Sequence, residues 1–464
     1  IDVEVECGYY VDSLNASAKV NSEELVVRIG EDSSAVRLGA TESRGEVWFE
    51  KDGMWGLGRL DLGMSRFRVA LMDAAFTAET VSVGVLSWKE PTDGRFETNG
   101  MEWGGVQIPP IQGDFILSAE KLAVDARSRP LPEAQAEIIG SINWREGAPA
   151  GTFRFTIPWF ELKHDNILSK WIPVPASDVL TGFYTGKSYL QWEQGNLTQR
   201  MNAVVREGNW RRPAQKTGIL GINGAVVLES LVPPQTAAPQ RLVFDSAYTS
   251  GLGIGKGAVV LSMGGVAPLL LQLVECSWAG GTLKAYGVKI IPEKKAAEMV
   301  LQFSGQQLQE LLDIFEFKGA KATGTVNGRL PVNLDWGKRF SVSIGEGSLK
   351  AGMEGGTIRF TKETAEAILG IGKEAGAEED ELEKQVKVLM RRALEDMVYS
   401  DLSVTFINEP GEGTLAIVHL EGYGPAGTEE NRIPIGSLDV RIHDIGKIID
   451  SIIRGGGKGR IEVR

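Results

Sequence analysis

The sequence predicts a mainly β protein with a few amphipathic helices, in which an antiparallel sheet grows along one axis. Apolar residues alternate with polar ones over most of the chain, and glycines interrupt these runs at short intervals. Glycine accounts for 57 of the 464 residues, against about 7% on average. Such alternation, punctuated by glycine turns, is typical of antiparallel strands with one apolar and one polar face.

The alternation is clearest between Phe317 and Phe360, where no cluster of reactive side chains interrupts it. Turns at Gly337-Lys338, Gly345–Gly347 and Gly355-Gly356 divide the stretch, which predicts a meander of four or more strands. The predicted apolar face consists of Leu330, Val332, Leu334, Trp336, Phe340, Val342, Ile344, Leu349, Met353, Ile358 and Phe360.

The first 124 residues repeat this pattern of strands and turns. Their alternation predicts a second stretch of apolar strand face. We expect this face to carry Val3, Val5, Phe67, Val69, Leu71, Val81, Val83 and Val85.

Helices are predicted at four places, near residues 159–171, 304–316, 362–398 and 445–454. Ser304 and Gln307 have the spacing of a capping box before the second of them. We divide the chain at residue 217, into segments 1–217 and 218–464, or else expect one continuous elongated domain.

Two patterns recur. A strand runs directly into a short amphipathic segment near Phe153, Val300 and Leu438, and a turn with paired glycines follows Trp103, Trp278 and Glu354. Diverged repeats of a strand-rich unit predict an architecture extended by stacking.

Composition excludes several functions. A net charge of −12 argues against a nucleic-acid partner, because no basic stripe is present. Cys7 and Cys276 sit in strand-like runs and are interpreted as buried apolar residues. The three histidines lie apart, so neither a metal site nor a catalytic triad is predicted, and no cofactor is expected.

Without a metal site or a catalytic triad, we expect a non-enzymatic protein, but the sequence leaves alternatives. Acidic residues beside tryptophans, such as Glu102-Trp103 and Asp335-Trp336, also occur in carbohydrate-binding or carbohydrate-processing β proteins, but no carboxylate pair is fixed at a useful separation. The apolar strand faces fit either a closed core or an open trough that holds something apolar. Periodicity alone does not distinguish a closed core from an open trough.

Three motifs carry a resemblance to a known family. These are a G-x-V-x-G-R-L-P strand (Gly324, Gly328, Leu330, Pro331), an I-x-x-G-x-L-x-A run (Ile344, Gly347, Leu349, Ala351), and a G-G-x-I turn (Gly355, Gly356, Ile358). Together with SWAGGTL upstream and the run from Leu394 to Ile453, they resemble the C-terminal region of the YdbH branch of the AsmA-like bacterial envelope proteins, which also include TamB and YhdP. The resemblance covers residues 218–453.

This resemblance implies an elongated, curved sheet, U-shaped in section, with an apolar groove. It implies a periplasmic protein that an N-terminal helix, missing here, anchors in the inner membrane. An outer-membrane lipoprotein is implied as a partner at the C-terminal end. Older labels of the family mention dicarboxylate transport, which no arginine-rich pocket in the sequence supports.

The function predicted is therefore a periplasmic conduit that carries phospholipid between inner and outer membranes along the apolar face, without catalysis. Acyl chains would bind the strand faces named above. The alternative is a structural scaffold whose exposed sheet edge recruits a partner strand.

Overall fold

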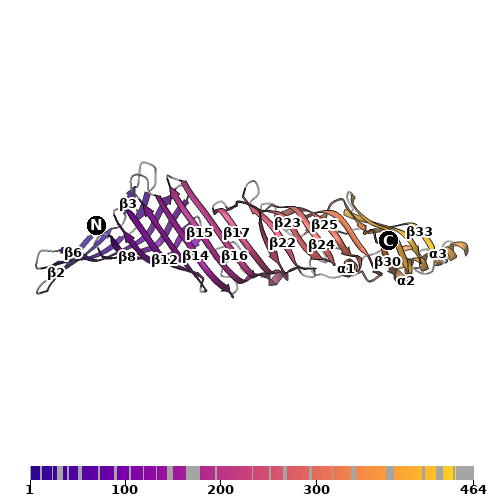
Figure 1. Ribbon diagram of the computed structural model, residues 1–464, viewed down its shortest axis with the longest axis horizontal. Helices are drawn as coiled ribbons and strands as arrows, with labels where there is room; N and C mark the ends of the chain where they lie inside the picture. Colours follow the sequence, from indigo (N-terminus) through magenta and orange to yellow (C-terminus); the bar gives the residue numbers. More distant parts are fainter. Residues whose placement is uncertain are drawn as a thin grey trace. The chain divides into compact units, whose positions relative to one another are not determined.

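The structure is a computed structural model, drawn in Figure 1. It describes the backbone of residues 2–442 and of Ile445, and of the strands before Ala78 only the backbone. The gaps in this range are 11–12, 23–24, 29–34, 39–40, 51–54, 72–73, 88–90, 104–105, 119, 132, 144–149, 164–177, 194–195, 232–233, 250–251, 265–268, 292–294, 316, 336–340, 372–380, 410–412, 425–431 and 443–444.

The protein is mainly β, and its strands form one large, open antiparallel sheet. The chain divides into two compact units, the first comprising Ile1–Gly208 and Ala225–Pro233, the second Asn209–Gly224 and Pro234–Arg464. The boundary predicted from the sequence, residue 217, falls within 209–233, where the chain passes from the first unit to the second and back.

Long strands dominate the first unit. They are β1 (Asp2–Tyr10), β2 (Ser13–Ser22), β3 (Leu25–Arg28), β4 (Ala35–Leu38), β5 (Thr41–Glu50), β6 (Trp55–Leu71), β7 (Ala74–Ser87), β8 (Thr92–Asn99), β9 (Met101–Trp103), β10 (Val106–Ile108), β11 (Ile111–Leu117), β12 (Lys121–Leu131), β13 (Ala134–Asn143), β14 (Ala150–Leu162), β15 (Val179–Glu193) and most of β16 (Asn196–Arg212).

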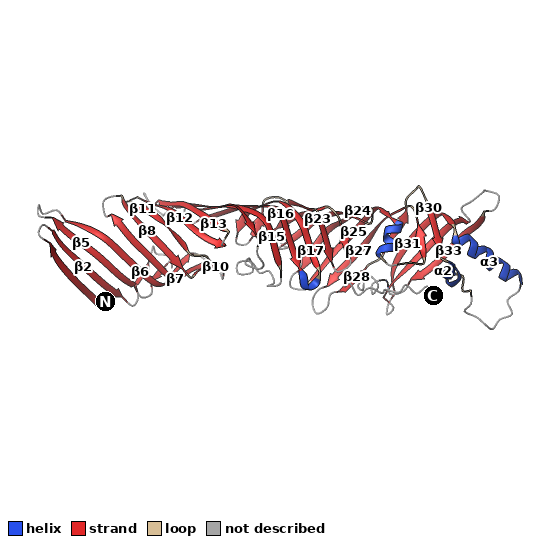
Figure 2. Ribbon diagram, turned by 90° about the horizontal axis from the view of Figure 1, so that it is seen from below, coloured by secondary structure: helices blue, strands red, loops and turns tan. Residues whose placement is uncertain are grey.

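A 3₁₀ turn at Pro213–Gln215 and strand β17 (Thr217–Leu231) lead into the second unit. Its strands are β18 (Pro234–Thr236), β19 (Gln240–Phe244), β20 (Ser246–Thr249), β21 (Leu252–Ile254), β22 (Gly257–Met263), β23 (Leu269–Trp278), β24 (Gly281–Ile291), β25 (Ala296–Gln307), β26 (Ala320–Ala322), β27 (Thr325–Asp335), β28 (Ser341–Ile344), β29 (Gly347–Ala351), β30 (Gly356–Phe360), β31 (Met397–Glu409), β32 (Gly413–Gly424) and β33 (Ile433–Ile442). Its helices are α1 (Leu308–Ile314), α2 (Lys362–Ile368) and α3 (Glu381–Glu395), blue in Figure 2.

Most ladders join strands that follow each other in the sequence, such as β12 with β13 and β31 with β32. Short hairpins are inserted between some partners. In the sequence, hairpin β9–β10 separates β8 from β11, which pair with each other. Hairpin β3–β4 likewise separates the paired strands β2 and β5. The strands predicted between Phe317 and Phe360 are present, but the prediction that they form a meander is wrong. Their ladder is one interrupted hairpin, in which β26 and β27 form one side and β30, β29 and β28 pair along them as the other.

Glycine permits the sharpest interruption of that ladder. Gly324 separates β26 from β27 with a φ of +96°, a conformation that side chains other than glycine rarely adopt. A Cβ at this position would also collide with the Tyr399 hydroxyl, which donates a hydrogen bond to the Thr323 carbonyl at 2.9 Å. Because Gly324 has no side chain, the buried Tyr399 hydroxyl of β31 can reach the Thr323 carbonyl at the bend between β26 and β27.

Two helix predictions fail at their starts. Residues 159–162 continue strand β14, and the remainder of the predicted helix lies in 164–177, outside the described residues. Proline explains the error: the ladder of β14 with β15 shifts register between Ile157 and Phe160. Pro158, which has no N–H to donate, is accommodated in this irregularity without ending the strand. The change in hydrophobic period near Pro158 therefore reflects a β-bulge and not the start of a helix.

The capping box before α1 is also wrong. Ser304 and Gln307 belong to β25, and Gln307 caps α1 without a side-chain hydrogen bond. The fully buried Gln306 instead donates its amide N–H to the Thr282 carbonyl at 2.7 Å. Of the remaining predicted helices, α2 and α3 lie within 362–398, whereas only Ile445 of 445–454 is described.

Candidate functional site

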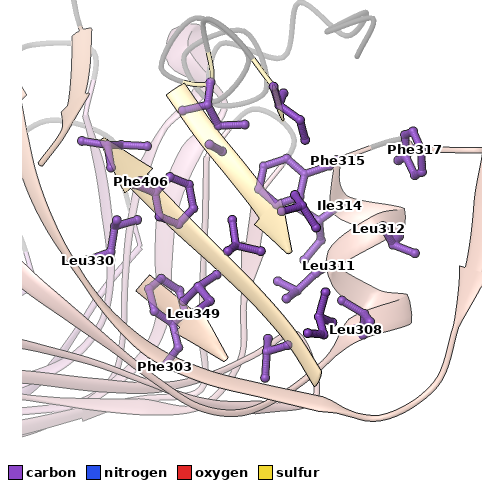
Figure 3. A pocket seen from close by; sticks show the side chains of 18 of the residues that line it. Phe303, Leu308, Leu311, Leu312, Ile314, Phe315, Phe317, Leu330, Leu349 and Phe406 are labelled. Carbon is purple, nitrogen blue, oxygen red and sulfur yellow. The ribbon is translucent and has the colours of Figure 1, made fainter. Parts of the chain in front are cut away.

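A cavity of about 540 Å³ lies in the second unit, and every residue that lines it is apolar. The sheet curves around it, and α1 closes one side (Figure 3). Its volume falls in the range of about 300–1,000 Å³ typical of small-ligand sites. Those sites normally place a few polar groups to orient the ligand, and this lining has none.

Strand periodicity produces the lining. In β27, Val326, Leu330 and Val332 are buried, and Leu330 and Val332 line the cavity together with Leu334, whereas Arg329 is exposed. Successive strand side chains point to opposite faces, so a strict alternation in sequence becomes an apolar inner face and a polar outer face.

Neighbouring strands continue this inner face. β25 contributes Met299, Leu301 and Phe303, and β31 contributes Leu402, Val404 and Phe406. Beyond β31 the lining continues through Ala416, Val418 and Leu420 of β32, and Val440 and Ile442 of β33.

Helix α1 covers one side of the cavity. Its Leu311 is buried, and Leu308 and Ile314 also line the cavity (Figure 3). Two backbone contacts seat the helix: the Leu308 N–H donates to the Gly324 carbonyl at 3.0 Å, and the Ala322 N–H donates to Gln309 Oε1 at 2.9 Å. The helix is thus fixed to the bend of the sheet, with its apolar stripe toward the cavity.

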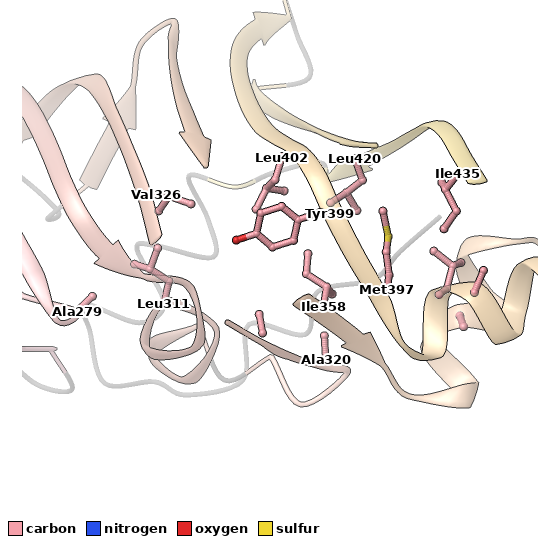
Figure 4. Packing of buried hydrophobic residues seen from close by; sticks show 14 residues of the cluster. Ala279, Leu311, Ala320, Val326, Ile358, Met397, Tyr399, Leu402, Leu420 and Ile435 are labelled. Atoms are coloured by element: carbon pink, nitrogen blue, oxygen red, sulfur yellow. The ribbon is translucent and has the colours of Figure 1, made fainter. Parts of the chain in front are cut away.

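Beyond α1 the same apolar face is filled. Ala393 and Leu394 of α3 pack with Met397, Tyr399 and Leu420 in one buried cluster (Figure 4). Ala365 of α2 belongs to the same cluster. Helix α2 begins at Thr361, whose side-chain oxygen accepts a hydrogen bond from the Thr364 N–H at 3.3 Å and so caps the helix.

Two buried groups near the site, a phenol and a thiol, are neutral at pH 7. Burial raises the pKa of the Tyr399 hydroxyl. Burial, and next the negative charge of Glu275, raise the pKa of the Cys276 thiol to about 11. The Trp278 ring lies 5.9 Å from that of Phe303, and its N–H is buried without a hydrogen-bond partner. A thiol and a phenol that stay protonated at neutral pH provide no nucleophile here.

A family model described as YdbH-like, intermembrane phospholipid transport protein YdbH, matches residues 106–426. The chain belongs to the YdbH-like family. The match covers more than half of the chain and confirms the resemblance that the glycine and proline motifs suggested. It also reaches further toward the N-terminus than residues 218–453. No curated protein and no solved structure matches the chain.

In this YdbH-like chain, eight of the predicted groove residues line the cavity. Met353 does not: it lies in the turn before β30, and its side chain is fully exposed, at 107%. The eight are Leu330, Val332, Leu334, Val342, Ile344, Leu349, Ile358 and Phe360.

The remaining predicted residues lie elsewhere or are not described. Val81 and Val83 are half-buried on β7 of the first unit. Trp336 and Phe340 lie outside the described residues. For the others only the strand backbone is described, and these are Val3, Val5, Phe67, Val69, Leu71 and Val85.

Sequence reasoning missed the lining from β25, β31, β32 and β33. Strands were predicted near Val300 and Leu438, in β25 and β33, and the alternation of Leu402–Phe406 in β31 is the same signal as in the stretch from Phe317 to Phe360. What was missing was the pairing of β29 with β31, which brings residues about 55 positions apart in sequence side by side, as at Gly347 and Phe406.

The part of the chain that the structure describes contains neither a metal site nor a membrane-spanning helix. No cluster of three or more histidine, cysteine or acidic side chains could hold a metal ion, and no helix is long and apolar enough to cross a membrane. His419 lies on the outer face, where its ring nitrogens contact Asp439 at 2.7 Å and Glu421 at 3.2 Å.

Proposed function

We propose that the chain is a non-enzymatic conduit that holds phospholipid acyl chains against the inner face of its sheet. The observation that carries the proposal is the cavity lined by apolar residues alone. Membership of a family of intermembrane phospholipid transport proteins supports the cargo. An acyl chain needs no hydrogen bond, whereas its head group needs water or polar partners.

Energetics favour such a site. Each methylene group transferred from water contributes about 0.8 kcal/mol. A chain that buries six to eight methylene groups would therefore gain about 5–6 kcal/mol before losing its freedom of motion. Since no polar contact fixes the chain at one position, it can slide along the strands while the head group remains in water.

The place of action follows from the family. We infer that the chain works in the periplasm, between the inner and outer membranes of a bacterial envelope. We further propose that an N-terminal segment anchors the protein in the inner membrane. At the C-terminal end, we propose an outer-membrane lipoprotein as the partner. The groove residues predicted in the first unit, such as Val81 and Val83, would extend the lipid path.

Photo-crosslinking in bacterial cells tests this proposal. A photoreactive amino acid at Leu330 or Leu349 faces the cavity, and at Arg329 or Ser348 it faces outward from the same two strands. We expect crosslinked phospholipid at the first pair and none at the second. Equal labelling of both pairs, or no labelling at any position, would refute the conduit.

A second candidate function is a scaffold that recruits a partner strand. It rests on β33, which pairs with β32 along one edge and with no other described strand along the opposite edge. An unpaired edge can accept a further strand. Proline substitutions at outward N–H groups of β33 that abolish partner binding but leave crosslinking at Leu330 intact would favour this function.

A further inference from the structure

Helix α3 carries one apolar stripe whose two ends have different surroundings. Leu382, Val386, Leu389 and Ala393 follow each other at spacings of four, three and four, which places them on one face of the helix. Ala393 is fully buried. Leu382, Val386 and Leu389 are 69%, 50% and 47% exposed.

The burial of the C-terminal half has a clear cause. Met390, Ala393 and Leu394 pack into the cluster formed with β31, β32 and β33. The N-terminal half of α3 reaches past β33 (Figure 2). A helix normally buries its apolar stripe against its own domain, so three large exposed side chains in line indicate a surface that binds something else.

The unpaired charges among the described side chains of α3 are positive. Lys387 pairs with Glu383 at 3.1 Å, and Arg391 pairs with Glu366 at 3.6 Å. Lys384 and Arg392 are exposed, and neither forms an ion pair with another described residue. At about 100° per residue, Arg392 lies beside the stripe and Lys384 lies on the opposite face. A helix with leucine and valine on one face and free cations on its remaining surface has the features of helices that lie in a lipid interface.

The stripe is also continuous with the cavity. Met390 packs against the same buried cluster as Ile368 of α2, and Ile368 lines the cavity. Apolar side chains in mutual contact therefore connect the exposed turns of α3, through this buried cluster, to the proposed lipid site.

We propose that the exposed half of α3 docks on a phospholipid bilayer, with Leu382, Val386 and Leu389 inserted among the acyl chains and Arg392, beside this stripe, near anionic head groups. The choice of a bilayer rests on the proposed lipid function, because a helix packed on the same apolar cluster as the cavity would place the conduit beside its lipid source or destination.

Flotation of the full chain with vesicles of phosphatidylethanolamine and phosphatidylglycerol tests the docking. The double variant Val386→Asp/Leu389→Asp should bind at least about tenfold more weakly. Met353→Asp, which adds a carboxylate at a fully exposed apolar residue of the same unit, should bind as the unchanged chain does. Arg392→Glu should weaken binding only when the vesicles contain phosphatidylglycerol.

Three results would overturn the docking proposal. The unchanged chain does not float, the double variant floats equally well, or light scattering shows that the unchanged chain dimerises through this face and the double variant does not. Crosslinking at Leu330 separates this proposal from the conduit. A double variant that loses vesicle binding but retains crosslinked lipid supports both, whereas vesicle binding without crosslinked lipid at Leu330 refutes the conduit alone.

Discussion

The two ends of the inner face in the second unit have the same strand chemistry but different fillings. Around Phe303, Leu330 and Phe406, the side chains of the sheet surround an empty volume of about 540 Å³. Around Tyr399 and Leu420, helices α2 and α3 fill the space against the same strands. The comparison shows that the alternation of a strand decides which face is apolar, whereas the connections between strands decide what covers it.

The largest expected effect is at the filled end. Leu394→Ala removes a fully buried side chain and should lower the free energy of unfolding by about 3–5 kcal/mol, because the surrounding atoms cannot fill the new void. Chemical denaturation followed by tryptophan fluorescence measures the change. A loss below about 1 kcal/mol would mean that this end is not packed as described.

Ligand should stabilise the open end. A single-chain phospholipid at one hundred times its Kd should raise the free energy of unfolding by about 2.7 kcal/mol. Leu349→Asp places a carboxylate in the lining and should remove this stabilisation, while Ser348→Asp on the outer face of the same strand should retain it. Equal stabilisation of both variants would contradict a ligand site in the cavity.

Leu349→Ala should cost less than Leu394→Ala, about 1–2 kcal/mol. The substitution loses the transfer free energy of the removed atoms, but its side chain already borders an empty volume, so little additional void is created. The same denaturation assay on both variants measures the difference. Equal losses would remove the contrast between the two ends.

Tyr399→Phe tests the junction of the two ends. The variant keeps the buried ring but leaves the Thr323 carbonyl without the hydroxyl donor at 2.9 Å. We expect a loss of about 1–2 kcal/mol in the free energy of unfolding. Thr357→Val serves as a comparison, because it removes only the contact with the exposed Thr323 hydroxyl at 2.9 Å and should cost less.

The smallest effect is expected on the outer face, at His419. Hydrogen bonds to Asp439 and then to Glu421 raise the pKa of its imidazole above 6.5. The folded chain therefore binds this proton more tightly than the unfolded chain does. The resulting stabilisation is fully present below the unfolded pKa and is lost as the pH rises through the higher folded pKa.

His419→Gln should accordingly reduce the difference in stability between acidic and weakly alkaline pH, with little change at the alkaline end. Denaturation midpoints at several pH values measure this. A variant that loses stability equally at every pH would show that the imidazole contributes by packing and not by its charge.

The strands and the inner face could be predicted from the sequence because they depend on local periodicity. Leu330, Val332 and Leu334 line the cavity for the reason given by their alternation. Met353 broke the rule because its parity was counted through a turn, in which successive side chains no longer alternate across a sheet.

What covers the face could not be predicted in this way. Leu311 and Leu394 both belong to amphipathic stripes in the sequence and to the same buried cluster, yet Leu311 also borders the cavity and Leu394 does not. The difference depends on where each helix lies along the sheet, since α1 leads into β26 and α3 leads into β31. Local pattern also misled at Pro158 and Ser304, where a strand with a bulge has the composition of a helix start.

The pairing of strands close in sequence has a consequence for how this chain folds. Ladders such as β6–β7, β12–β13 and β31–β32 are joined by short connections, so each can close with a small loss of chain entropy. Hairpins can therefore add to the sheet in the order in which they are synthesised, each using the previous edge as its template. The contact of β29 with β31 is an exception, because it waits for α2 and α3 to form. We expect this step to be the slowest in completing the second unit.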